Sequence, residues 1–256
     1  MTIDTPGVVN LALADPDPDG DGDQDIMLTM RTHWRAGSDA KPGIGWIEQK
    51  SAREWVYKDI SVNVGLNEMR TLQTIDINQN GVDEIISSNS EDGSTWIFSL
   101  DPMGEWSRWE ITGIGAVNSH YNLVHDVNGD GLADFVFGRG DGIYFADMSK
   151  DLLAPEIQKI SSLHGITNAV ITEIVAADLN QDGSDELIFS LRGVGVYYSI
   201  PPSKTEEWST HWVSFQAQNY HGVRIIDYDG DGRLDVLANV EYPANRLELW
   251  HQVPTN

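Results

Sequence analysis

The sequence contains no cysteine, which excludes a disulfide framework, a thiolate metal site and a cysteine nucleophile. It is also poor in cations, because 16 lysine and arginine residues face 40 aspartate and glutamate residues, and the net charge is -24. Such an acidic chain is repelled by phosphate backbones, so we expect no nucleic acid partner. No run approaches 18 apolar residues, and the first residues lack the basic and apolar regions of a signal peptide. We therefore expect neither a membrane span nor a leader in this sequence.

The acidity of the chain does not indicate disorder. Apolar residues make up 40% of the sequence, which has nine tryptophans, eight tyrosines and six phenylalanines, more than disordered acidic chains contain. The acidic residues gather in short clusters with asparagine and glycine instead of long runs, which is typical of cation sites. A chain of 256 residues can bury a sizeable core in one domain or in two.

Five short segments follow one nine-residue rule, and they begin about fifty residues apart. Position 1 is Asp, positions 3 and 5 are Asp or Asn, position 6 is Gly, and position 9 is Asp or Glu, with an apolar stretch directly after it. The five segments are residues 17–25, 76–84, 126–134, 178–186 and 227–235. A repeat of this period is typical of propeller blades.

The residues around each segment predict four strands per repeat. An alternating apolar stretch comes before the segment, as in residues 170–176, and a second strand directly follows it. A glycine-led aromatic strand comes next, as in residues 142–145, and a tryptophan-led strand follows at residues 55–60, 106–111 and 208–213. Antiparallel sheets repeated radially avoid long exposed edges. We predict an all-β fold, a five-bladed β-propeller of four-stranded antiparallel blades.

The repeat assigns the whole chain, residues 1–256, to a single propeller domain. The expected blades are residues 7–60, 61–112, 113–160, 161–214, and 215–256 together with 1–6. The fifth repeat ends after Trp250 with no fourth strand of its own, while residues 2–7 align with fourth-strand endings such as residues 110–115. We expect the N-terminal strand to complete the last blade and close the ring.

The loops and their flanking strands resemble the FG-GAP/VCBS repeats of integrin α-subunit propellers and of many secreted microbial proteins. The resemblance covers essentially the whole chain, and it implies that calcium binds between the first two strands of each blade. Family propellers commonly have seven blades, so with five either this ring is small or the chain is a fragment of a longer array. The resemblance also implies an extracellular or periplasmic protein whose leader is absent from this sequence.

Calcium suits these loops because it takes six to eight oxygen ligands, which alternate positions of a tight turn can supply. Zinc prefers His or Cys, which do not recur in the loops, and an EF-hand needs Glu at position 12, which none of them has. We expect up to five calcium ions. The expected ligands are Asp17, Asp19, Asp21, Asp25, Asp76, Asn78, Asn80, Glu84, Asp126, Asn128, Asp130, Asp134, Asp178, Asn180, Asp182, Glu186, Asp227, Asp229, Asp231 and Asp235. The site of Asp76–Glu84 is expected to be the weakest, because asparagine replaces two carboxylates there.

The end of the blades opposite the calcium loops is the expected ligand-binding face. Second-to-third-strand and blade-to-blade connections lie at that end, and loops of this kind carry function. The candidate ligand-binding residues are His33, Trp34, Arg35, His120, Tyr121, Tyr220, His221 and Tyr242, with Arg192 and Arg246 in nearby loops. We expect Trp34, Tyr121 and Tyr220 to be exposed and to stack on sugar rings or peptide groups.

Three functions are open at this stage. The preferred hypothesis is a calcium-stabilised binding module for carbohydrate, and a protein ligand or a scaffold role is a further alternative. The catalytic alternative is a carbon–oxygen lyase, a polysaccharide lyase or sugar dehydratase that uses acid–base groups and an arginine. Its candidate residues are His120, Tyr121, Tyr220, His221 and Arg70. A glycosidase would need a carboxylate pair outside the loops, such as Glu68 with Glu173 or Glu241. No serine-nucleophile, phosphate-loop or zinc-protease motif is present.

Overall fold

The computed structural model describes most of the chain as β-strands and the turns between them. The described residues are 8–10, 17, 19, 21–31, 43–60, 69–89, 92–115, 117, 119–163, 166, 168–202, 208–241 and 243–252. Within these residues there are nineteen strands and no helix, and hence no helix that could cross a membrane.

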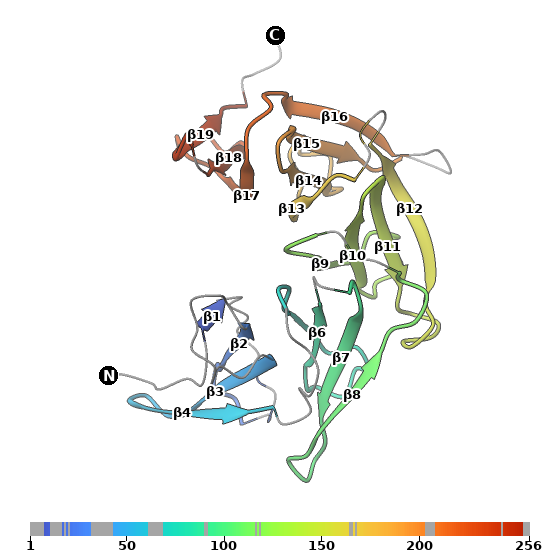
Figure 1. Ribbon diagram of the computed structural model, residues 1–256, viewed down its shortest axis with the longest axis vertical. Helices are drawn as coiled ribbons and strands as arrows, with labels where there is room; N and C mark the ends of the chain where they lie inside the picture. The colour runs from blue at the N-terminus through green and yellow to red at the C-terminus, as the bar shows by residue number, and fades with distance from the viewer. Residues whose placement is uncertain are drawn as a thin grey trace. The chain divides into compact units, whose positions relative to one another are not determined.

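The strands form five sheets in chain order, and consecutive strands are neighbours in every sheet (Figure 1). The first two sheets are β1 (Val8–Asn10), β2 (Ile26–Arg31), β3 (Gly43–Ser51) and β4 (Glu54–Asp59), then β5 (Gln73–Ile75), β6 (Glu84–Ser88), β7 (Thr95–Leu100) and β8 (Trp106–Glu110). The third and fourth are β9 (Leu123–His125), β10 (Asp134–Arg139), β11 (Gly142–Asp147) and β12 (Glu156–Ser162), then β13 (Ile171–Ala177), β14 (Glu186–Leu191), β15 (Gly195–Ile200) and β16 (Ser209–Ser214). The fifth is β17 (Tyr220–Ile226), β18 (Asp235–Val240) and β19 (Arg246–Trp250).

The predicted fold class, an all-β five-bladed propeller, is confirmed by these five successive sheets. The fifth sheet has three strands within the described residues, as the missing fourth strand of the last repeat predicts. Residues 1–7 lie outside the described residues, so closure by the N-terminal strand stays a prediction. The next residues belong to the first blade, because β1 pairs antiparallel with β2, Val8 opposite Arg31.

The chain divides into two compact units, and we describe each unit by itself. One unit comprises residues 1–117, 126–134 and 146–157, and the other comprises residues 118–125, 135–145 and 158–256. The division passes through the third sheet. The single domain over residues 1–256 stays a prediction.

Burial explains why the strands of a blade differ in sequence. The second strands β6 and β14 are buried at every residue, which accounts for their consecutive apolar residues, Ile85–Ile86 and Leu187–Phe189. The fourth strands β4, β8 and β16 are largely exposed or half-buried, and they combine polar residues with aromatic ones. Each unit has its own packed core, built around Met27, Trp46 and Phe98 in the first and around Ile188 and Tyr220 in the second.

Candidate functional site

The nine-residue loops all end at the start of a second strand, and in the second to fifth blades they join the first strand to it. Their folding is set by the Asp at position 1, whose carboxylate accepts the backbone N–H groups of positions 5 and 6 in all five loops. In the second loop, Asp76 accepts them from Asn80 at 2.9 Å and from Gly81 at 2.7 Å. The sequence rule therefore encodes a specific turn.

The glycine at position 6 is required by the backbone. In all five loops this residue has a φ between 84° and 90°, in the left-handed region that glycine adopts without strain. Position 4 is also left-handed where it is described, at Gln79, Gly129, Gln181 and Gly230. Two left-handed residues so close together curl the chain and turn the side chains of positions 1, 3 and 5 toward one another.

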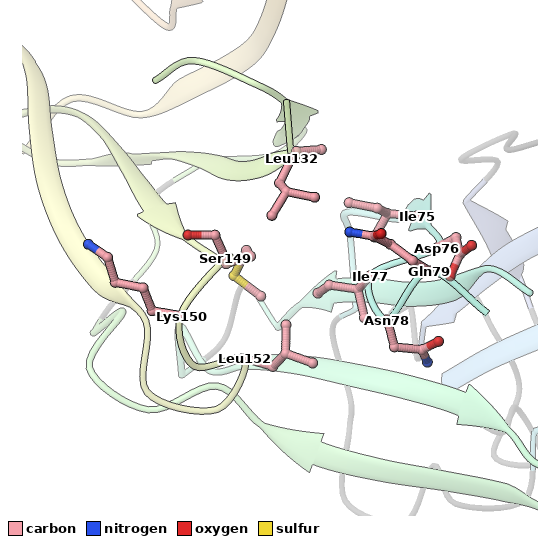
Figure 2. Close-up of a pocket in the computed structure, with 11 residues that line it drawn as sticks. Ile75, Asp76, Ile77, Asn78, Gln79, Leu132, Ser149, Lys150 and Leu152 are labelled. Atoms are coloured by element: carbon pink, nitrogen blue, oxygen red, sulfur yellow. The ribbon is translucent and has the colours of Figure 1, made fainter. Parts of the chain in front are cut away.

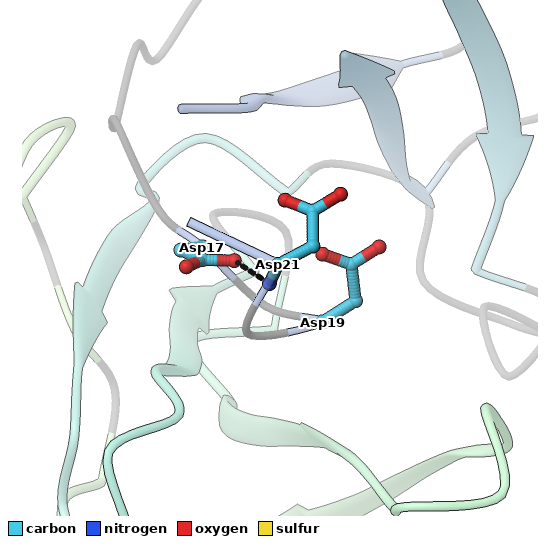
Figure 3. Close-up of side chains that lie close together, drawn as sticks. All are labelled: Asp17, Asp19 and Asp21. Atoms are coloured by element: carbon cyan, nitrogen blue, oxygen red, sulfur yellow. Dashed lines mark hydrogen bonds between the residues drawn. The ribbon is translucent and has the colours of Figure 1, made fainter. Parts of the chain in front are cut away.

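Carboxylates gather most closely in the first and fifth loops. In the first, oxygens of Asp17, Asp19 and Asp21 lie within 4.8 Å of one another, and Figure 3 shows the three side chains around the turn. The fifth loop repeats this cluster with Asp227, Asp229 and Asp231. The middle three loops have asparagine at position 3, so an amide oxygen takes the place of one carboxylate there.

The carboxylate at position 9 is the buried member of every loop. Asp25, Glu84, Asp134, Glu186 and Asp235 are only 1% to 3% exposed. In the last four loops this carboxylate accepts the backbone N–H of position 2, which ties the end of the loop back to its start. Position 9 is therefore both a candidate ligand and a structural part of the turn.

Burial disfavours the ionised form of most of these carboxylates. It raises the pKa of Asp134 to about 7, and the charges of Asp147 and Asp130 add to the rise. Burial also raises the pKa of Glu84 and Glu186. Asp235 differs, because the backbone N–H of Gln252 lowers its pKa. A bound cation would relieve this cost, and the oxygen donors of the loops fit calcium rather than zinc.

A small cavity lies beside the second loop. It has a volume of about 190 Å³ and is bordered by Asp76 and Asn78 of that loop and by residues of the third repeat, among them Leu132, Lys150 and Leu152 (Figure 2). In Figure 2 the side chains of Leu132 and Leu152 point toward the second loop. Its lining mixes apolar side chains with polar ones such as Asn78, Gln79 and Ser149, and we assign no ligand to this cavity.

The opposite end of the second unit holds a polar pocket of about 300 Å³. It is lined by Tyr121, Glu173, His221, Gly222, Val223, Arg224, Leu237, Asn239 and Leu247, and we call it the polar pocket. β13 and β17 contribute residues from their first halves and run from there to the fourth and fifth nine-residue loops. The polar pocket therefore lies at the end of these two blades that is away from the loops, as predicted for a ligand face.

An ion pair organises the polar pocket. The buried carboxylate of Glu173 pairs with the guanidinium of Arg224 and accepts the backbone N–H of Val223 at 2.8 Å. A Cβ at Gly222 would come within 2.9 Å of oxygens of Glu173 and Asn239. Glycine at this position therefore leaves room for these polar side chains beside the backbone.

The structure brings several predicted ligand-face residues together. The rings of His120 and His221 have centroids 5.4 Å apart, and Arg192 Nη2 lies 3.5 Å from His120 Nδ1. His221 lines the polar pocket with Tyr121, whereas His120 is only 9% exposed. Arg70 belongs to the first unit, and its proposed catalytic part stays a prediction. The predicted residues His33, Trp34, Arg35, Glu68 and Tyr242 lie outside the described residues.

The prediction that Tyr220 is an exposed aromatic anchor is wrong. Tyr220 is fully buried, its ring packs with Val223 and Val236, and its hydroxyl donates a hydrogen bond to Glu248 at 2.7 Å. It is also the first residue of β17 rather than part of the connection before it. A β-bulge between Tyr220 and Gly222 shifts the strand register there and changes which side chains face the core.

Replacement of Tyr220 by alanine is expected to destabilise the protein by about 3 to 5 kcal/mol, because it empties a packed aromatic site and removes a hydrogen bond to Glu248. Thermal unfolding followed by circular dichroism measures this loss. Tyr121→Ala is the matched control and should leave the melting temperature nearly unchanged, since Tyr121 is only partly buried. An equal loss of melting temperature in Tyr220→Ala and Tyr121→Ala would contradict the placement of Tyr220 in the core.

Comparison with known proteins supports the repeat and the fold. Residues 126–189 match the family model of the FG-GAP-like repeat. They span the third loop, the fourth loop and the strands between and directly after them. The match confirms the resemblance to FG-GAP repeats in this part of the chain, and the five sheets make the protein a β-propeller. No sequence among the curated proteins matches the chain significantly.

Solved structures with low sequence identity align with the chain, and the first of those described here supports the fold. An auxiliary nutrient binding protein from Bacteroides ovatus has a TM-score of 0.57 at 11% identity, and the match covers 96% of this chain and 57% of that one. An Agrocybe aegerita lectin that recognises non-reducing terminal N-acetylglucosamine has a TM-score of 0.45 at 14% identity, covering 94% and 80%. The V. cholerae biofilm matrix protein Bap1 has a TM-score of 0.49 at 18% identity, covering 94% and 38%. The chain thus spans little more than half of the nutrient binding protein.

Proposed function

We propose that this chain is a calcium-stabilised β-propeller that binds carbohydrate at the end of its blades away from the calcium loops. The observation that carries the proposal is the polar pocket. It combines an aromatic ring, Tyr121, with an imidazole, a guanidinium, a carboxylate and an amide, from His221, Arg224, Glu173 and Asn239. Sugar rings offer apolar C–H faces to aromatic rings and hydroxyl groups to such planar polar side chains.

Calcium has a structural role in this proposal. Positions 1, 3, 5 and 9 of the five loops would hold it, and its charge would offset carboxylates that repel one another when they are crowded or buried. The second site, Asp76–Glu84, would be the weakest. Sites of this kind suit an extracellular or periplasmic location, where calcium is not kept at cytosolic levels. The nutrient binding protein from Bacteroides ovatus supports a ligand of the nutrient class by its name alone.

A lyase is the second candidate function, and one observation favours it. The imidazoles of His120 and His221 lie next to each other with Arg192 beside them, an arrangement of acid–base groups and a cation. Tyr220 does not take part as an exposed acid in this alternative, because it is fully buried. Release of unsaturated uronic products from a polysaccharide would favour this function over binding alone.

Binding to a glycan array, followed by calorimetry with the strongest ligand, tests the proposal. Tyr121→Ala and His221→Ala are expected to weaken binding by on the order of 1 to 3 kcal/mol, because both side chains line the polar pocket. Trp212→Ala is the matched control, since Trp212 is an exposed aromatic residue on β16 outside this pocket. Unchanged affinity in the first two variants, or equal loss in the control, would contradict the assignment of the site.

A further inference from the structure

Glu48, outside the nine-residue rule, lies directly beside the first calcium loop. It follows Ile47 in β3, and Ile47 pairs with Ile26, the residue after Asp25 at position 9. The backbone N–H of Gln49 donates to Asp25 Oδ1 at 2.8 Å, which holds the two segments together. The carboxyl group of Glu48 also lies against that of Asp19 at position 3. Glu48 therefore reaches two positions of the loop.

Glu48 lies opposite position 9 of its loop, and the residue opposite position 9 on the third strand differs from blade to blade. The strand register assigns it to Ser99 in the second blade, Ile200 in the fourth and His251 in the fifth. Ser99 and His251 both contact the position 9 carboxylate of their own loop, Ser99 at 3.2 Å and His251 at 3.3 Å. Among these four blades, the first alone has a carboxylate there. The third blade also has a second carboxylate beside position 9, because Asp147, the last residue of β11, lies near Asp134.

Glu48 is buried with an oxygen that lacks a donor. It is 1% exposed, and Lys50 and Lys58 both bind its Oε1, at 2.5 and 2.7 Å. Within the described part of the chain no hydrogen-bond donor reaches its Oε2, and none reaches Oδ2 of the equally buried Asp25. The buried indole N–H of Trp46 lies near the carboxylate of Asp25 and acts on it, but outside regular hydrogen-bond geometry. Buried acceptors without donors are costly, and here two lie at one end of one loop.

The two lysines satisfy only one of the two carboxylate oxygens of Glu48. The ammonium groups of Lys50 and Lys58 both contact Oε1 of Glu48, as expected for an ion pair with a carboxylate. A purely structural ion pair accounts for Oε1. It leaves Oε2 of Glu48 and Oδ2 of Asp25 unsatisfied, next to the three clustered aspartates of the loop. A hard cation would satisfy both oxygens at once.

We infer that Glu48 is an additional ligand of the first calcium site, which makes that site the tightest of the five. The inference rests on the proposed calcium loops and goes beyond them, because it adds a residue from the third strand. With Glu48 the site has five carboxylates and would bind through both the loop and β3. Affinity for calcium rises with the number of charged ligands and with the rigidity of the site. The ion would also fix the loop to β3.

Calcium titration of the full chain by calorimetry tests the inference. Glu48→Gln is expected to weaken the tightest binding step by about tenfold or more, because it removes one charged ligand while keeping the shape of the side chain. The remaining steps should not change. Glu54→Gln is the matched control, since it removes a charge from an exposed residue of the adjacent strand β4. If Glu48→Gln does not fold, Glu48→Asp is compared in the same way, because its shorter side chain keeps the charge but moves the carboxylate away from the loop.

Asp25→Asn separates this inference from the proposed function. A parent protein that binds no calcium would overturn both. If the parent binds calcium and Asp25→Asn abolishes the tightest step, but Glu48→Gln leaves that step unchanged, the calcium loops stand and the role of Glu48 is overturned. Loss of affinity in both variants supports the inference.

Discussion

Removal of calcium with EDTA is expected to lower the melting temperature of the protein by roughly 10 °C or more. A ligand that binds only the folded state stabilises it by about 2.7 kcal/mol per site when its free concentration is a hundredfold above the dissociation constant. For a chain of this length, each kcal/mol corresponds to about 2 to 4 °C. The structural reason is the burial of the position 9 carboxylates, such as Asp134 and Glu186, whose charge the calcium-free protein leaves without a cation.

Differential scanning calorimetry in calcium, in EDTA and in magnesium measures this effect. Magnesium at the same concentration is the control, and it should restore less stability because it demands stricter octahedral geometry than these loops offer. The melting temperature should return when calcium is added back. An unchanged melt after demonstrated metal removal would refute a structural role for calcium in the loops.

The effect of Asp134→Asn on the free energy of unfolding is expected to change sign when calcium is removed. In calcium the variant should be less stable than the parent, because the third loop loses a charged ligand. In EDTA it should be more stable than the parent at pH 8. The pKa of Asp134 is raised to about 7 in the folded protein, so its stabilising contribution is present below its unfolded pKa and is lost as pH rises through 7. Asparagine cannot ionise and avoids that loss.

Chemical denaturation at pH 5 and pH 8, each with calcium and with EDTA, measures this crossover. Without calcium the parent should lose stability between the two pH values, and Asp134→Asn should lose less. Glu105→Gln is the control, since it removes an exposed carboxylate outside the loops. If Asp134→Asn is less stable than the parent in EDTA at pH 8 by as much as in calcium, Asp134 is a packing residue and not a ligand.

The turn of the calcium loops could be predicted from the sequence because the constraint is local. Glycine at position 6 and oxygen-bearing side chains at positions 1, 3 and 5 are close in the chain, and the backbone hydrogen bonds they make stay within the loop. Which side chains of a strand face the core is determined less locally than the turn of a loop. The predicted exposed residue Tyr220 lies in the core, next to a bulge that ends at Gly222; a glycine within a strand can indicate such a bulge, but it does not show which side chains then face the core.

The candidate binding residues depend on contacts between strands that the sequence does not encode locally. Glu173 is predicted only as a member of a glycosidase pair and Arg224 is not predicted at all, because their ion pair depends on how β13 and β17 pack together. Glu48 could not be assigned to the first loop either. Its place beside Asp25 follows from the register of β2 and β3, which are separated in the chain by residues 32–42.

The calcium content of the folded protein tests the central claim most directly. Equilibrium dialysis against millimolar calcium, followed by elemental analysis, gives the number of ions bound per chain. The five loops predict five ions per chain at saturation, and one fewer for a variant with Asp25→Asn. A folded parent protein that holds no calcium under these conditions would contradict the account.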